Sequence, residues 1–197
     1  MPAGVTYEDN FEVERELYAV DSGYRSQGGF NLVVDGLSAQ SHVPVLCPLH
    51  LDFANRKAYV VNNVKVYESA AKGATSIKIA KGSFAHAGIN YMLSAAVSIA
   101  VSAVDSTNDA YDVLTVAATG ADIPANSVLT ECTVVEGEAT AVRSANALNY
   151  ARTKIVKGET ITALYRAYEI KEAELYIPVT EGDKKTLTDR FMFIPLK

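Results

Sequence analysis

The sequence has little of several residue types that sites and scaffolds commonly use. Its 197 residues include no tryptophan, three histidines and two cysteines, Cys47 and Cys132. The cysteines lie far apart and form no CxxC pair, so we expect reduced, buried thiols rather than a disulfide framework. The most apolar window, residues 95–104, is interrupted by serines and is shorter than the roughly 20 residues that span a bilayer. The sequence therefore predicts neither a disulfide scaffold nor a membrane span.

Positive charge is also scarce. The net charge is −5, and the longest run of basic residues is Lys184-Lys185. Proteins that bind nucleic acid by neutralising phosphates usually carry a basic face, so we expect no nucleic-acid partner. The first residues show neither the basic and apolar regions of a secretory signal nor the glycine of a myristoylation site. We therefore expect synthesis and assembly in the cytoplasm.

The first forty residues differ in pattern from the rest. Residues 8–16 are strongly acidic. The aromatic residues that recur through the first forty residues have neither helical nor strand spacing. The sequence predicts an extended arm over residues 1–40, which orders against its own body or a partner. The aromatic residues of this arm are candidate contacts: Tyr7, Phe11, Tyr18, Tyr24 and Phe30.

Residues 41–197 have the pattern of a β-rich body. Hydrophobic residues make up 49% of the chain and charged residues 21%, which is enough apolar material for a core. Turn signals recur every 8–12 residues or so, which is typical of all-β domains. We expect a mainly β fold, a β-barrel or β-sandwich of at least seven strands.

Several segments give more specific expectations. Val43 to Leu51 alternates, but its two prolines predict an edge or bulged strand. Asn62-Asn63 predicts a bend between two strands. Residues 136–153 are weakly patterned and predict a loop with a helical turn. Residues 159–179 fit either a helix or a strand, and their threonines and tyrosines favour a strand. Residues 181–189 predict a short helix or turn, followed by a terminal strand.

The stretch "IKIAKGSFAHAGINYM", Ile77 to Met92, contains residue types that phosphate loops and nucleophilic sites use. A phosphate loop needs GxxxxGK[ST] before a helix, whereas Lys81 here precedes Gly82 and strands flank the stretch. Ser83 and His86 lack a neighbouring carboxylate to orient the histidine. The pattern favours a hairpin-like turn with His86 at its exposed tip.

Other clusters of chemistry-bearing residues are equally incomplete. Cys47 would point away from His50 and Asp52 on a strand, so a metal site would need a bulge there and ligands such as His42 or His86. Carboxylates gather at Glu169, Glu172 and Glu174, where a solvated face is the simpler interpretation. The loop from Asp105 to Asp112 offers oxygen ligands for calcium but lacks the glycine and glutamate of an EF-hand. We expect no catalytic residue, metal or cofactor.

The order of several segments resembles the head fibre proteins of tailed bacteriophages, such as phages of Bacteroides-like gut bacteria. The resemblance covers residues 43–179, through strand and turn signatures rather than a catalytic motif. It rests on "PVLCPLHLDFANRKAYVVNNVKVYE", "SIKIAKGSFAHAG", "AVSIAVSAVDSTNDAYDVLTV" and "LYRAYEIKEAELYIPV". The resemblance implies an oligomer, namely a trimer. It also implies a place on the capsid surface of the virion, where the protein is bound to the major capsid protein.

These observations lead to one expectation and two alternatives. The expectation is a non-enzymatic virion protein whose arm contacts the capsid through its aromatic residues. Its subunits are expected to meet at the small residues of one strand and at the turn: Ser98, Ala100, Ser102 and His86. The first alternative is a module that binds a host-surface glycan or receptor. The second is a glycan hydrolase using Glu169, Glu172 and Asp112, which would require a cleft with paired carboxylates.

Overall fold

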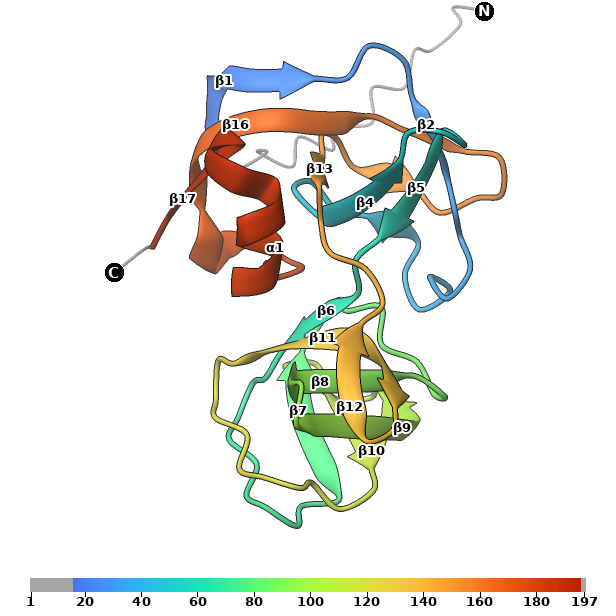
Figure 1. The fold of residues 1–197 in the computed structure, drawn as a ribbon, viewed down its shortest axis with the longest axis vertical. Coiled ribbons are helices and arrows are strands. Elements are labelled where there is room, and N and C mark those ends of the chain that lie inside the picture. The colour runs from blue at the N-terminus through green and yellow to red at the C-terminus, as the bar shows by residue number, and fades with distance from the viewer. Residues whose placement is uncertain (1–15, 196–197) are drawn as a thin grey trace, which may run out of the picture.

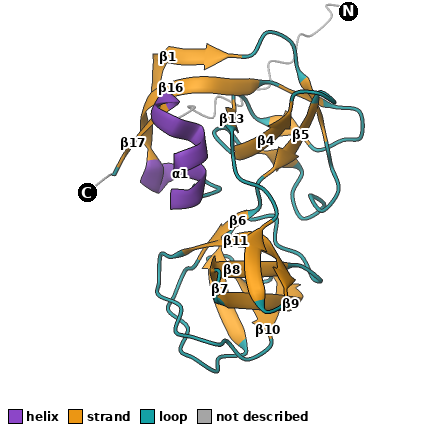
Figure 2. Ribbon diagram, in the orientation of Figure 1, coloured by secondary structure: helices purple, strands orange, loops and turns teal. Residues whose placement is uncertain are grey.

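The computed structural model describes residues 16–195, which form two β-rich units (Figure 1). Residues 16–62 and 143–195 form the first, which we call the split unit, because residues 63–142 are inserted into it as a second, the inserted barrel. Figure 2 shows strands throughout both units and helical turns only in the split unit. The predicted mainly β class is therefore confirmed, with a barrel as its clearest element.

The split unit is a curved, half-open sheet with one helix against it. Its sheet has the order β1-β16-β13-β4-β5-β2-β15, with β17 beside β16, and β14 pairs separately with β3. The strands are β1 (Ala19–Arg25), β2 (Phe30–Leu32), β3 (His42–Val43), β4 (Pro48–Asp52), β5 (Lys57–Val60), β13 (Ala147–Asn149), β14 (Thr153–Lys154), β15 (Thr160–Ile161), β16 (Ala163–Lys171) and β17 (Phe191–Ile194). The helical segments are η1 (Glu172–Glu174), α1 (Glu181–Leu187) and η2 (Thr188–Arg190). None of the helices in the described part of the chain has the length and apolarity needed to cross a membrane.

The inserted barrel is a compact sheet that curls almost onto itself. Its order is β12-β11-β8-β9-β10-β7, and β6 pairs with β11. A bridge between Val66 and Ile79 brings the chain after β6 against β7, which nearly closes the barrel. The strands are β6 (Asn63–Lys65), β7 (Ser76–Ala80), β8 (Asn90–Ser94), β9 (Val97–Asp105), β10 (Tyr111–Val116), β11 (Val128–Val135) and β12 (Glu138–Ala141). Inward Val, Ile and Leu side chains fill it, as their alternation along the strands requires.

The structure confirms some of the local predictions and corrects others. Most of residues 159–179 form strand, as β15 and β16, but the strand ends at Lys171 and η1 follows it. After this segment come α1 and β17, as expected. The strand around Leu49 is not at an edge, because β4 lies between β13 and β5 and places Pro48 at its first residue. Residues 136–153 are not a loop but contain β12 and β13, whose few residues gave too short a pattern to recognise.

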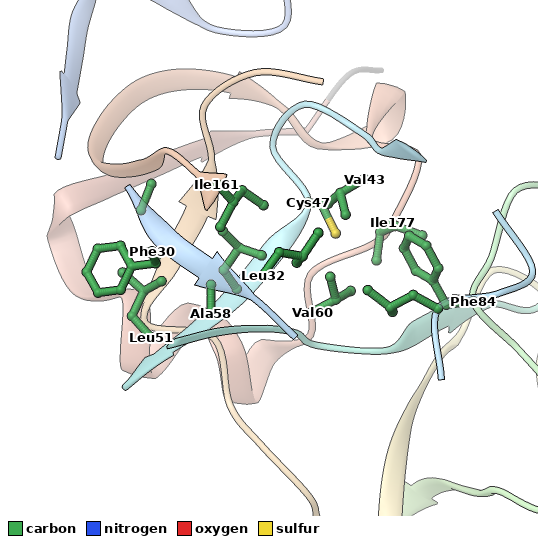
Figure 3. Close-up of a cluster of buried hydrophobic side chains, with 14 residues drawn as sticks. Phe30, Leu32, Val43, Cys47, Leu51, Ala58, Val60, Phe84, Ile161 and Ile177 are labelled. Atoms are coloured by element: carbon green, nitrogen blue, oxygen red, sulfur yellow. The ribbon is translucent and has the colours of Figure 1, made fainter. Parts of the chain in front are cut away.

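The predicted hairpin in residues 77–92 is wrong, because β7 pairs with β10 whereas β8 pairs with β9 and β11. Between Gly82 and Gly88, both at positive φ, the chain leaves the barrel and reaches the split unit. There Phe84 is fully buried in a cluster with residues of the split unit. Figure 3 shows its ring beside Ile177, at the end of the split unit's core. The stretch is therefore a loop of the barrel that packs against the split unit.

A buried polar network joins the units where the chain passes between them. Asp183 of α1 is 2% exposed, and its Oδ1 accepts a hydrogen bond from the Ala145 amide at 2.7 Å. Its Oδ2 accepts from Asn63 Nδ2 at 2.9 Å and from the Thr180 hydroxyl at 2.7 Å. Thr180 Oγ1 in turn accepts from the Asp183 amide, which makes a capping box at the start of α1. The Asp183 carboxylate thus bonds the chain that enters the barrel at Asn63, the chain that returns at Ala145, and the start of α1.

The predicted boundary between arm and body at residue 40 does not separate two units. β1 pairs with β16, and β2 lies between β5 and β15, so residues 19–32 belong to the sheet of the split unit. Short strands with glycines between them lack a clear period, which explains why this part was predicted as an extended arm. Residues 1–15 lie outside the described part of the chain.

Candidate protein-binding surface

A row of aromatic rings leads from the core of the split unit to its surface. The buried ring of Phe30 meets Phe53 edge-on, with ring centroids 5.7 Å apart. Phe53 lies 6.3 Å from Tyr165, and Tyr165 lies 6.4 Å from Tyr24. We call the outer members of this row and their neighbours on β16 the aromatic strip: Tyr24, Phe53, Tyr165, Arg166 and Tyr168.

The pairing of β1 with β16 positions the strip. Tyr24 lies opposite Arg166, and the register is irregular between Ala19 and Tyr24. In that irregular part the Ser22 hydroxyl donates to Ala19 O at 2.6 Å and accepts from the Tyr168 amide at 2.8 Å. The side chain of Ser22 therefore replaces a ladder hydrogen bond and holds the bulged edge strand against β16.

The strip exposes a large amount of ring surface. Tyr24 is 56% exposed, Phe53 59% and Tyr168 37%. The Arg166 guanidinium lies 6.0 Å from the ring centroid of Tyr24 and 5.9 Å from that of Tyr168, within cation–π range. Tyrosine, phenylalanine and arginine are the residue types enriched in the centres of protein interfaces, where they lose water on both sides. The arrangement is thus suited to binding another protein.

Only part of the predicted capsid-contact set lies on this surface. Tyr24 belongs to the strip, and Tyr18 is half-buried against the second core cluster of the split unit. Phe30 is fully buried, with the Arg56 guanidinium 4.4 Å from its ring centroid. The Phe30 prediction is therefore corrected, because the ring packs inside the sheet that β2 joins. Tyr7 and Phe11 lie outside the described residues.

The predicted subunit-contact residues lie on the inserted barrel. Ser98, Ala100 and Ser102 are exposed on β9, whose alternate residues Ile99 and Val101 are buried. They form a small-residue outer face, as their alternation predicts. His86, by contrast, is half-buried rather than at an exposed tip: its Nδ1 lies 3.2 Å from Phe84 O. A Cβ at Gly36 would meet the His86 ring at 3.2 Å, so this histidine faces the split unit.

The candidate metal ligands serve local structure. Within residues 16–195, no group of three His, Cys, Asp or Glu side chains could hold a metal ion. Burial raises the pKa of Cys47 far above that of an ordinary thiol. His50 Nδ1 lies 2.9 Å from Ser144 O, consistent with a proton on that nitrogen. Asp52 accepts hydrogen bonds from the backbone and side chain of Asn55.

The other acidic residues are engaged in turns and ion pairs. Asp105 accepts from the Thr107 amide at 3.0 Å, as turn-forming aspartates do. Asp112 is buried and pairs with Lys81 at 2.8 Å. Glu172 pairs with Lys184 at 2.7 Å, on the rim of an open hollow of about 760 Å³ between α1 and β17. Glu169, at φ 57°, occupies an irregular position of β16. Asp105, Asp112 and Glu172 thus lie in separate turns and pairs, and Glu169 lies within β16.

Most of the aromatic strip was not predicted as a site. Tyr165, Arg166 and Tyr168 come from "LYRAY", a run whose aromatic and basic residues gave a strand prediction and nothing more. Phe53 follows β4 and is brought to the strip by the turn before β5. The available signal was Arg166 and Tyr168 two residues apart on a strand, because residues i and i+2 share a face and so bring a cationic and an aromatic group together.

No protein-family model matches the chain, and no curated protein matches it.

Proposed function

We propose that the chain is a virion structural protein of a tailed bacteriophage, a head fibre or capsid decoration protein that binds the major capsid protein through the aromatic strip. The observation that carries this proposal is the exposure of Tyr24, Phe53 and Tyr168 on one strip, with Arg166 near the rings of Tyr24 and Tyr168. Rings of this size each contribute about 1–3 kcal/mol when a partner buries them fully. The resemblance of residues 43–179 to head fibre proteins supplies the class of partner.

The same proposal assigns oligomerisation to the barrel. Ser98, Ala100 and Ser102 present a face of small side chains on β9, which leaves room for the backbone of a second subunit to approach closely. The protein then assembles as a homotrimer in the host cytoplasm and is carried on the capsid surface of the virion, with no catalytic activity. Light scattering coupled to size exclusion checks this directly, because a trimer has three times the chain mass of 21.1 kDa. A monomer at micromolar concentration contradicts the trimer.

The test of capsid attachment is co-sedimentation of the purified chain with empty capsids. We expect the double variant Tyr24→Ala/Arg166→Ala to lose binding by a factor of about 100, since it removes two central contacts. The matched control is Tyr176→Ala, which truncates a tyrosine of 68% exposure outside the strip. Wild-type binding by the double variant, or an equal loss in the control, contradicts the role of the strip.

A further inference from the structure

A second exposed aromatic group lies on the inserted barrel, away from the strip. The rings of Tyr67 and Tyr111 have centroids 5.4 Å apart and planes tilted by 36°. Tyr67 is 52% exposed and follows β6, with its amide donating to Lys78 O at 2.9 Å. Tyr111 begins β10 opposite Ala80 of β7. The pair therefore stands on the outer side of the seam where β6 meets β7.

Two charged side chains border these rings. Lys78 Nζ lies 4.9 Å from the ring centroid of Tyr111 and forms an ion pair with Glu68. The hydrogen bond with Glu68 raises the pKa of Lys78 above its ordinary value, because it stabilises the charged ammonium. The Lys78 ammonium and the Glu68 carboxylate together offer hydrogen-bond donors and acceptors next to an apolar ring face, and the pair carries no net charge.

Closing the barrel does not require these rings. The seam is made by the Val66–Ile79 bridge, and both of those side chains are fully buried inside the barrel. A tyrosine that exposes half of its surface adds little to that core. Its exposed ring is therefore available to a ligand, and the small size of the group suits a small ligand rather than a protein surface of the usual area.

The chemistry of the group selects the ligand class. The C–H bonds on one face of a pyranose carry partial positive charge and pack against the negative face of an aromatic ring. The sugar hydroxyls at its edge then exchange hydrogen bonds with the ammonium and carboxylate beside the rings. An anionic ligand is disfavoured because Glu68 already neutralises Lys78, and the whole chain carries a net charge of −5. We propose that Tyr67, Tyr111, Lys78 and Glu68 form a binding site for a neutral saccharide.

The experiment uses the full chain and three neutral probes, maltohexaose, mannohexaose and laminarihexaose. The readout is the NMR signals of the Tyr67 and Tyr111 rings, titrated with each probe to about 10 mM. We expect at least one probe to shift both rings with a Kd of about 1 mM. Tyr67→Ala should weaken that binding about ten-fold, whereas Tyr67→Phe should keep it because the ring face remains.

The controls separate this site from the strip. Tyr24→Ala truncates an equally exposed tyrosine of the split unit and should bind the saccharide as the wild type does. Tyr67→Ala should still co-sediment with capsids, so the saccharide site and capsid attachment fail independently. The proposal is overturned if no neutral probe shifts the two rings, or if Tyr67→Ala binds as tightly as the wild type. Tighter, salt-sensitive binding of a heparin hexasaccharide to the same rings also overturns it.

Discussion

The split unit and the inserted barrel bury their apolar side chains in different ways. The barrel has one cluster of Val, Ile and Leu enclosed by a sheet that nearly meets itself at Val66 and Ile79. The split unit has two clusters on a half-open sheet, and it needs α1 and the chain around Phe84 to cover them. Closure removes edges, whereas an open sheet leaves an edge strand such as β1. The half-open unit accordingly exposes more large apolar side chains than the barrel does.

The two units nevertheless depend on each other. Phe84 leaves the barrel to fill the end of the split unit's core, and Asp183 of the split unit bonds Asn63 at the start of the barrel. Both links are buried: the contact of Phe84 is apolar, and the hydrogen bond between Asp183 and Asn63 is polar. We therefore expect the units to unfold together, although each has a core of its own.

The largest effect is expected for Phe84→Ala, which empties the end of the split unit's core. The variant should lose about 3–5 kcal/mol of unfolding free energy, the usual cost of removing a buried phenylalanine. Each unit carries one buried thiol, Cys47 in the split unit and Cys132 in the barrel. Burial raises the pKa of both thiols, so each reacts with a thiol reagent only after its own unit opens.

Thiol labelling in a urea series then shows whether the units are coupled. In the wild type, Cys47 and Cys132 should become reactive at the same urea concentration. In Phe84→Ala, Cys47 should react at lower urea than Cys132, because the cavity lies in the split unit. Val135→Ala, at a residue 68% exposed, is the control and should change stability by less than about 0.5 kcal/mol. If the two thiols of Phe84→Ala still become reactive at the same urea concentration, the coupling between the units does not depend on this contact.

A somewhat smaller effect is expected when the polar link is removed. Asp183→Ala leaves Asn63, the Ala145 amide and Thr180 without their acceptor, at a cost of about 3 kcal/mol in unfolding free energy. Amide hydrogen exchange at Ala145 should accelerate, because that donor loses its partner. Glu181→Ala, on the same helix with a side chain 83% exposed, removes only a surface ion pair worth up to about 1 kcal/mol. If Asp183→Ala and Glu181→Ala are equally stable, the hydrogen bonds of Asp183 do not stabilise the junction between the units.

The fold class could be predicted from the sequence, but the division into two units could not. Alternation in β7 and β9 was sufficient to predict strands, and Asn62-Asn63 predicted a bend. That bend is where the chain crosses to the barrel, which depends on a partner residue, Asp183, 120 positions away. Local patterns carry no information about such a distant contact.

The candidate site shows the same limit. Tyr24 was predicted as a contact because of its residue type and polar neighbours. Phe30 had the same features but lies at the other end of the ring row, inside the core. What separates the two is the position of β1 at the edge and β2 in the interior of the sheet. Sheet order is set by pairings between distant segments, so the sequence pattern alone could not assign them.

The smallest effect is expected for the pKa of an aspartate in a turn. It compares the turn at Asp52 in the split unit with the turn at Asp105 in the barrel. The Asn55 side chain and then its backbone amide hold the pKa of Asp52 below its usual range, whereas the backbone amide of Thr107 does so for Asp105. Both turns therefore contribute stability above the unfolded carboxyl pKa of about 3.9, and lose it as pH falls through the lower folded value. We expect Asn55→Ala to raise the pKa of Asp52 toward its ordinary value and to leave Asp105 unchanged. Carboxyl ¹³C NMR titration measures both groups in one sample. A shift of both midpoints would mean that the substitution perturbs the barrel as well, and an unmoved Asp52 would mean that Asn55 does not stabilise its charge.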